Sequence, residues 1–258
     1  MRDLTYPAII ATAKTAFRAL GNSFQLTGTE NVPREGGALL VYNHISYVDF
    51  VYGGFAANPS GRLVRFMAKR ELFDHKISGP LMRSMHHIEV DRGEGLESYD
   101  RALEYLRAGE LVGIFPEATI SRALELKEFK SGAVRIAAAV GVPLIPVVLW
   151  GTQRMLTKDH PRDLSRGHTI AITVGEPIQV DSSDPVGETR RLRATMTRML
   201  DDTIAAYPAE EQPPGAWWLP ARHGGSAPTL DEAVQLDAEE KRARARKRAE
   251  RRAGKKKT

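Results

Sequence analysis

Short apolar runs bounded by glycine, proline or polar residues recur along the chain, and helical patterns lie between several of them. Runs of this length are typical of buried strands, and a repeat of three to four residues is typical of helices. Such alternation predicts an α/β fold, a single domain with a largely parallel, helix-covered sheet. The expected strands are residues 38–42, 64–68, 88–90, 111–115, 144–149 and 169–174, and the expected helices are 96–107, 131–140 and 188–206.

The two ends of the chain differ from this central pattern. Residues 1–24 contain an amphipathic helix whose apolar face either packs on the domain or lies in a membrane interface. Residues 25–220 form the expected main domain. Residues 221–258 are expected to be a linker followed by a basic tail, either a solvated helix or a frayed segment. Trp217 and Trp218, just before this linker, suit either a docking pair or an interfacial anchor.

Composition and charge narrow the possible functions. The 258 residues are 42% apolar and include no cysteine, which excludes a disulfide framework, a thiolate metal site and a cysteine nucleophile. No apolar run reaches the roughly 18–20 residues that span a bilayer. Residues 238–258 hold eleven Lys and Arg and three Glu, so this tail carries +8 and the other 237 residues carry −3. The tail suits an anionic lipid surface, and its lack of aromatic residues argues against nucleic acid.

Polar residues follow three of the expected strands: Asn43-His44, Asp91-Arg92 and Pro116-Glu117. Ligand chemistry in such sheets tends to lie beyond the carboxyl ends of the strands. If His44 lies in the turn after its strand and Asp49 in the next helix, the carboxylate can orient the imidazole. The second imidazole nitrogen could then take a proton from a substrate hydroxyl. Because there is no G-x-S-x-G nucleophile motif, the attacking group is expected to belong to the substrate.

Four segments, in order, resemble the motifs of the glycerolipid acyltransferases, which include lysophosphatidic acid acyltransferase. The first is His44-x4-Asp49 with Ser46 between them, and the second is Ile88-Glu89-Val90-Asp91-Arg92. The third is Phe115-Pro116-Glu117-Ala118-Thr119, similar to the family's F-P-E-G-T-R, and the fourth is Val142-Pro143-Leu144-Ile145-Pro146-Val147.

The resemblance implies transfer of a fatty acyl group from acyl-CoA or acyl carrier protein to 1-acylglycerol 3-phosphate, without a cofactor. His44 would be the general base and Asp49 its partner. Arg92 would hold the acceptor's phosphate, where a guanidinium makes paired hydrogen bonds. Glu117, with Pro116 and Thr119, would shape the acceptor site, and Ser46 would be a further substrate-binding residue. The expected partners are the lysophospholipid and a membrane lipid surface, with the protein peripheral on the cytoplasmic face of the cell membrane.

The third motif departs from the family pattern at two positions, with Ala118 in place of glycine and Ile120 in place of arginine. These changes leave glycerol 3-phosphate or another lysolipid open as the acceptor, with Arg122 a possible substitute for the missing arginine. A non-catalytic membrane-binding relative and a hydrolase also remain open. Lys69, at the end of an expected strand, is either a contact for substrate charge or a solvated lysine. His86 and His87 near Glu89 and Asp91 are not expected to bind a metal, because neighbours on a strand point to opposite faces.

Overall fold

A seven-stranded, mostly parallel sheet forms the centre of the protein in a computed structural model that describes residues 5–91 and 95–255. The strands lie in the order β1-β7-β6-β2-β5-β3-β4, and β6 with β7 is the antiparallel pair. The predicted α/β fold is confirmed. The strands are β1 (Ser23–Thr27), β2 (Ala38–Tyr42), β3 (Val64–Lys69), β4 (Ile88–Val90), β5 (Leu111–Ile114), β6 (Leu144–Trp150) and β7 (Thr169–Val174).

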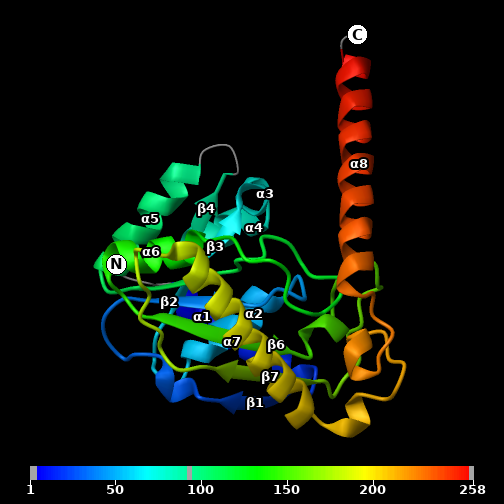
Figure 1. Cartoon of the computed structure of the whole chain (residues 1–258), viewed down its shortest axis with the longest axis horizontal. Coiled ribbons are helices and arrows are strands. Elements are labelled where there is room, and N and C mark those ends of the chain that lie inside the picture. Colours follow the sequence, from blue (N-terminus) through cyan, green and yellow to red (C-terminus); the bar gives the residue numbers. More distant parts are fainter. Residues whose placement is uncertain (1–4, 92–94, 256–258) are drawn as a thin grey trace.

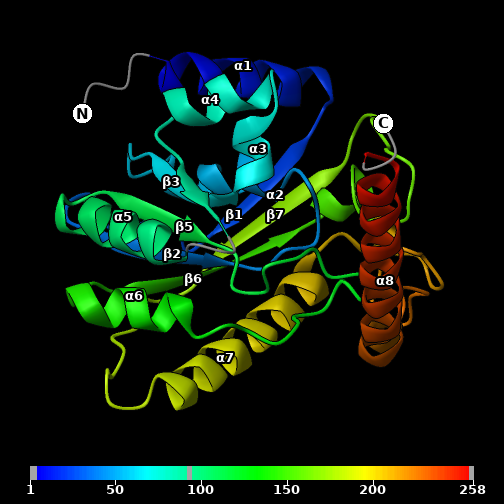
Figure 2. The same cartoon turned by 90° about the horizontal axis from the view of Figure 1, so that it is seen from above.

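Helices cover both faces of the sheet (Figures 1 and 2). One face carries α1 (Tyr6–Ala19), α2 (Asp49–Gly53), α3 (Arg70–Asp74) and α4 (Ser78–Ser84). The other carries α5 (Gly95–Arg107), α6 (Gly132–Val140) and α7 (Pro185–Ala206). The last helix, α8 (Leu230–Lys255), stands at one end of the molecule, with much of its length projecting from the body.

The alternation of strand side chains divides the core between the two faces. In β2, Leu39 and Val41 pack with α5, α6 and α7, whereas Leu40 and Tyr42 pack with the residues of α1 and α2. Both faces of this strand are therefore buried, as expected for a central parallel strand covered by helices.

The N-terminal helix α1 lies against the body on one side. Its buried residues are Tyr6 and Phe17, and the Phe17 ring stacks on Tyr52 with a centroid separation of 4.2 Å. The Tyr6 hydroxyl donates to the Val64 carbonyl at 2.8 Å, which ties the start of the helix to β3. Among the described residues, none of the helices combines the length and the apolar character that a membrane crossing requires.

One strand of the fold was not expected from the sequence. Strand β1 was not predicted, because it is an edge strand with mostly exposed residues and pairs only with β7. The C-terminal segment forms one long helix, one of the two forms expected for this tail, and the first half of the helix contacts the body through Asp237 and Glu240.

Candidate active site

His44 lies in the turn between the carboxyl end of β2 and the first residue of α2. The residue before it, Asn43, fixes the start of this turn. The Asn43 amide donates to the Leu149 carbonyl at 3.0 Å and accepts from the Leu149 N–H at 2.7 Å. Since β6 pairs with β2, this side chain extends the sheet pairing by one residue and holds the turn against β6.

The structure brings His44 and Asp49 together, with His44 Nδ1 2.9 Å from Asp49 Oδ2. The same oxygen accepts the N–H groups of Ile45 and Ser46, each at 2.7 Å. Its neighbour Oδ1 accepts the Thr152 hydroxyl at 2.7 Å. Four donors thus hold a carboxylate that is fully buried, and that carboxylate in turn holds the imidazole in one orientation.

The imidazole of His44 keeps one nitrogen for a substrate. Asp49 engages Nδ1, and within the described part of the chain no hydrogen bond reaches Nε2. The His44 side chain is 23% exposed, and its ring lies 4.4 Å from the Phe115 ring, centroid to centroid. A histidine fixed through Nδ1 and open at Nε2 has the arrangement of a general base.

Ser46 and Thr157 hold the rest of the turn in place. The Ser46 hydroxyl donates to the Leu156 carbonyl at 2.6 Å and accepts the Val48 N–H at 3.2 Å. The Thr157 hydroxyl donates to the Ile45 carbonyl at 2.6 Å. Ser46 is fully buried, so the structure places it as a support of the turn.

Glu117 follows β5, which pairs directly with β2, and its carboxylate joins two loops. Oε1 accepts the His44 N–H at 2.9 Å, and Oε2 accepts the Lys127 N–H at 3.1 Å. The Ser121 N–H donates to the His44 carbonyl at 2.8 Å, which adds a second link. Burial raises the pKa of Glu117 to about 8, against the opposing effect of the hydrogen bonds from Lys127 and His44.

Replacing Glu117 with Gln should change how stability depends on pH. The unfolded carboxyl releases its proton near pH 4.5 and the folded one near pH 8, so the folded state holds the extra proton between these values. The contribution of this carboxyl to stability should therefore fall as pH rises through this window, by at most about 1.4 kcal/mol per pH unit. Glu117→Gln removes this dependence. Urea unfolding of both proteins from pH 5 to 9 measures it, and a difference between them that is constant with pH would contradict it.

The third motif contains a strained residue. Ala118 has φ of 60°, in the left-handed region where a Cβ is unfavourable by roughly 1–2 kcal/mol. Glycine, the family's usual residue there, removes this strain, while the more flexible unfolded chain offsets part of the gain.

We expect Ala118→Gly to stabilise the protein by roughly 0.5–1 kcal/mol, measured by urea unfolding. A matched control is Ala11→Gly, at an exposed position inside α1, which should destabilise by roughly 1 kcal/mol. If both substitutions destabilised the protein equally, the left-handed strain at Ala118 would have no energetic effect.

The other residues named from sequence lie at different distances from this centre. Thr119 accepts a hydrogen bond from Lys127 Nζ at 2.6 Å, and Pro116 is buried, with its carbonyl accepting the Lys130 N–H. Lys69 is exposed at the end of β3, two strands from β2 in the sheet. Arg92 lies outside the described residues.

Two further sequence features have structural roles. His87 Nδ1 accepts the Phe66 N–H at 3.0 Å, and burial lowers the pKa of His87 to about 3. Trp217 stacks on His160 with centroids 3.7 Å apart, and the Trp218 indole donates to the Glu211 carbonyl. Within residues 5–91 and 95–255, carboxylate, imidazole and thiol side chains form no group of three or more suited to a metal ion.

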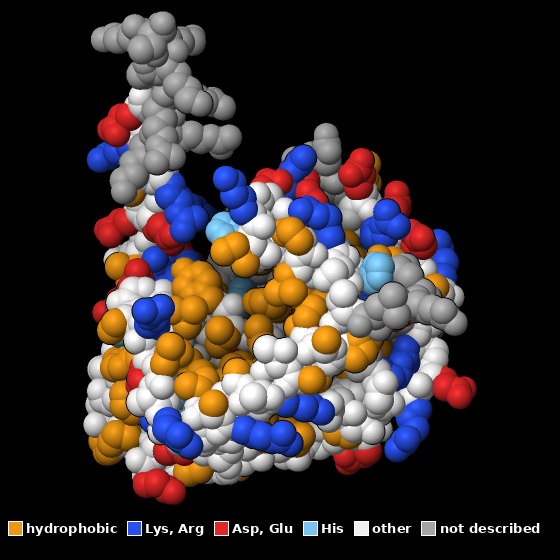
Figure 3. Space-filling model, turned by 180° about the vertical axis from the view of Figure 1, so that it is seen from behind, with side chains coloured by type: hydrophobic (Ala, Val, Ile, Leu, Met, Phe, Trp, Pro, Cys, Tyr) orange, Lys and Arg blue, Asp and Glu red, His pale blue; other side chains and the backbone are white. Residues whose placement is uncertain are grey.

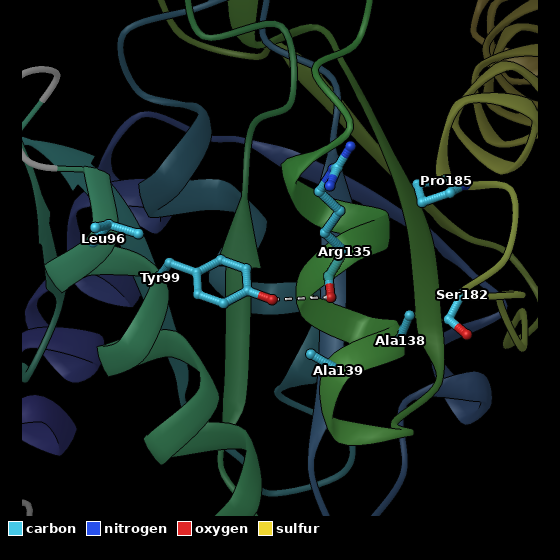
Figure 4. A pocket seen from close by; sticks show the side chains of 7 residues that line it. All are labelled: Leu96, Tyr99, Arg135, Ala138, Ala139, Ser182 and Pro185. Atoms are coloured by element: carbon cyan, nitrogen blue, oxygen red, sulfur yellow. Dashed lines mark hydrogen bonds between the residues drawn. The ribbon is translucent and has the colours of Figure 1, made fainter.

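An open pocket of about 420 Å³ lies elsewhere, between α5, α6 and the segment before α7 (Figure 4). The Tyr99 hydroxyl crosses from α5 to the Arg135 carbonyl on α6 at 3.4 Å. Neither His44 nor Asp49 lines this pocket, so it is separate from the candidate active site.

The candidate site consists of Asp49 with its four donors, His44 with an open Nε2, and the buried Glu117. It lies in an α/β fold that has known relatives. The chain belongs to the acyltransferase family: the family model described as Acyltransferase matches residues 23–150. It is 30% identical over 195 residues to the 1-acyl-sn-glycerol-3-phosphate acyltransferase of Bacillus subtilis (strain 168), covering 75% of this chain and 92% of that one.

Two further comparisons extend this result. The chain is 29% identical over 163 residues to the chloroplastic 1-acyl-sn-glycerol-3-phosphate acyltransferase LPAT1 of Arabidopsis thaliana, covering 62% of this chain and 44% of that protein. The fold is similar to the crystal structure of the 1-acyl-sn-glycerophosphate (LPA) acyltransferase PlsC from Thermotoga maritima, with a TM-score of 0.64 and 24% identity. That match covers 78% of this chain and 80% of the other.

Proposed function

We propose that this acyltransferase moves a fatty acyl group from acyl-CoA or acyl carrier protein to the free hydroxyl of 1-acylglycerol 3-phosphate, forming phosphatidic acid in phospholipid biosynthesis. The observation that carries the proposal is the contact of His44 Nδ1 with Asp49 Oδ2 at 2.9 Å, which leaves Nε2 for the acceptor. The Bacillus subtilis relative supports the choice of acceptor.

The reaction then needs no nucleophile from the protein. His44 Nε2 takes the proton of the acceptor hydroxyl as its oxygen attacks the thioester carbonyl. The tetrahedral intermediate collapses with cleavage of the carbon–sulfur bond, and the imidazolium returns its proton to the departing thiolate. The new ester carries the acyl group, and His44 ends neutral. Asp49 stabilises the imidazolium between the two proton transfers.

Binding of the acceptor is assigned to the neighbouring strand ends. Arg92 and Lys69 are proposed to meet the phosphate, and Thr119 and Pro116 to shape the acceptor site. Glu117 and Ser46 act by holding the His44 turn, since their oxygens are occupied by backbone groups. We place the protein on the cytoplasmic face of the cell membrane, where its lipid acceptor is found.

A second candidate acceptor is glycerol 3-phosphate or another lysolipid. Its basis is Ile120, which is 3% exposed and stands where the family usually has arginine. The side chain at that position therefore provides no charge for a phosphate.

A panel of acceptors tests the proposal. Labelled acyl-CoA is incubated with the protein and 1-acylglycerol 3-phosphate, glycerol 3-phosphate, another lysolipid or no acceptor. We expect the highest kcat/KM with 1-acylglycerol 3-phosphate. A higher kcat/KM with another acceptor would make that molecule the acceptor in place of 1-acylglycerol 3-phosphate. Release of CoA without an acceptor would indicate a hydrolase. Binding to liposomes without acyl transfer would indicate a non-catalytic relative.

A further inference from the structure

The helix α8 is attached to the body by charged side chains rather than by an apolar face. In its first turns Ala233 is buried, whereas Val234 and Leu236 are exposed. Ala233, Asp237 and Glu240 follow at intervals of four and three residues, so they share one side of the helix. The side facing the protein therefore carries two carboxylates, where a packed helix usually carries apolar residues.

These carboxylates pair with three cations of the body, which are Arg122, Lys127 and Lys158. We call these three residues the cation cluster. Asp237 accepts from Lys127 Nζ at 2.6 Å, from Lys158 Nζ at 3.1 Å and from Arg122. Glu240 Oε2 accepts from Arg122 Nη2 at 3.0 Å and from Lys158 Nζ at 3.3 Å. Although burial opposes ionisation, the hydrogen bonds from Lys127 and Lys158 hold the pKa of Asp237 below its usual range.

The cation cluster borders the candidate active site. The Lys127 N–H and the His44 N–H donate to the two oxygens of the same carboxylate, that of Glu117. Lys127 Nζ also donates to Thr119, in the third motif. With α8 in place, Arg122 is only 6% exposed. Arg122 also pairs with Asp159 of the body, so release of α8 frees chiefly Lys127 and Lys158. Lys127 lies beside Thr119 of the third motif, which is proposed to shape the acceptor site.

The residues of α8 that follow Glu240 have the opposite charge. Residues 241–246 are all exposed, and four of these six are Lys or Arg. Figure 1 shows the distal part of α8 projecting from the body. Figure 3 shows hydrophobic side chains gathered around a hollow on the face beside α8. A helix that presents several cations away from the body is suited to an anionic lipid surface.

We propose that α8 is a releasable cover: when its basic half binds an anionic lipid surface, Asp237 and Glu240 leave the cation cluster, which becomes available to the acceptor. Ion pairs on a polar helix face weaken in the presence of competing charge, whereas an apolar interface would not. The assignment of the freed cations to the acceptor rests on the proposed function, but the movement of α8 does not.

The movement can be measured without any enzymatic assay. Because the chain has no cysteine, Glu210→Cys on the body and Ala245→Cys on α8, both exposed positions, accept one spin label each. We expect the distance distribution between the labels to shift with vesicles of phosphatidylcholine and phosphatidylglycerol, and to stay unchanged with phosphatidylcholine alone. An unchanged distribution with both vesicles would overturn the proposal. Release by inorganic phosphate without vesicles would overturn the role of the basic half.

The effect on catalysis is tested by the double variant Asp237→Asn/Glu240→Gln. With the acceptor in neutral micelles, kcat/KM should rise on the order of fivefold over wild type, mainly through a lower KM for the acceptor. Phosphatidylglycerol should stimulate the wild type and have no further effect on the variant. Glu239→Gln, an exposed neighbour on the same helix, is the matched control and should behave as wild type.

The outcomes separate the two proposals. An equal kcat/KM for the double variant and the wild type in neutral micelles, at equal thermal stability, would overturn the cover. If the wild type transfers to no acceptor, the proposed function fails, and the spin-label distances still decide whether anionic lipid releases α8.

Discussion

Replacing His44 with Ala should lower kcat for acyl transfer by about 10²–10⁴-fold, the usual contribution of a positioned general base. The acceptor hydroxyl would then have no group to take its proton as it attacks the thioester. The KM of the acceptor should change little, because phosphate recognition is assigned to other residues. The fold should persist, since His44 is partly exposed and Asp49 keeps three other donors.

Steady-state rates with labelled acyl-CoA measure this effect, and thermal unfolding tests whether the variant remains folded. His75→Ala is a suitable control, because His75 is exposed at the end of α3 and takes no part in the candidate site. The control should keep the wild-type rate. Full transfer by His44→Ala would remove His44 from the mechanism and, with it, the observation on which the proposed function depends.

The sheet could be predicted from sequence because its central strands are buried on both faces. A run such as residues 38–42 has no polar position, and neither a helix of normal length nor a loop fits between its flanking glycines and His44. The edge strand Ser23–Thr27 lacks this signal, because four of its five residues are exposed. The antiparallel direction of β7 was not predictable, since a buried strand has the same apolar pattern whether it runs parallel or antiparallel to its neighbour.

In the candidate site, contacts between residues close in sequence were predicted, whereas contacts between distant residues were not. His44 and Asp49 are five residues apart, so a turn followed by a helix was enough to suggest their meeting. Thr152 lies 103 residues from Asp49 and completes the same carboxylate site. It follows β6, which pairs with β2, so the strand-end rule applied to β6 could have identified it.

The contacts of α8 had no comparable signal in the sequence. The net charge of the C-terminal segment is strongly positive, and a sum of charges hides the two carboxylates near the start of the helix. Lys127 and Asp237 are 110 residues apart and lie in a loop and a helix with no pattern in common. Only the folded chain shows that these acidic residues pair with cations that border the candidate active site.

The second large effect is expected for Asp49→Asn, which separates the charge of this residue from its shape. The amide oxygen can replace Oδ2 and keep the N–H groups of Ile45 and Ser46, while the amide nitrogen can donate to the Thr152 hydroxyl, which also accepts. The turn should therefore survive. A neutral amide cannot stabilise the imidazolium, however, so kcat should fall on the order of 10³–10⁴-fold.

Two matched variants test whether the fall in kcat comes from the lost charge or from a disturbed fold. Thr152→Val removes one donor to Oδ1 and leaves the His44 contact, so it should lower kcat much less than Asp49→Asn. Asp49→Ala leaves two buried N–H groups without an acceptor, at about 1–3 kcal/mol each, so it should lower the unfolding temperature as well as the rate. If Asp49→Asn kept kcat within tenfold of wild type at an unchanged unfolding temperature, the carboxylate would serve only to hold the turn. His44 would then act as a base without a charged partner, and Asp49 would contribute to folding rather than to catalysis.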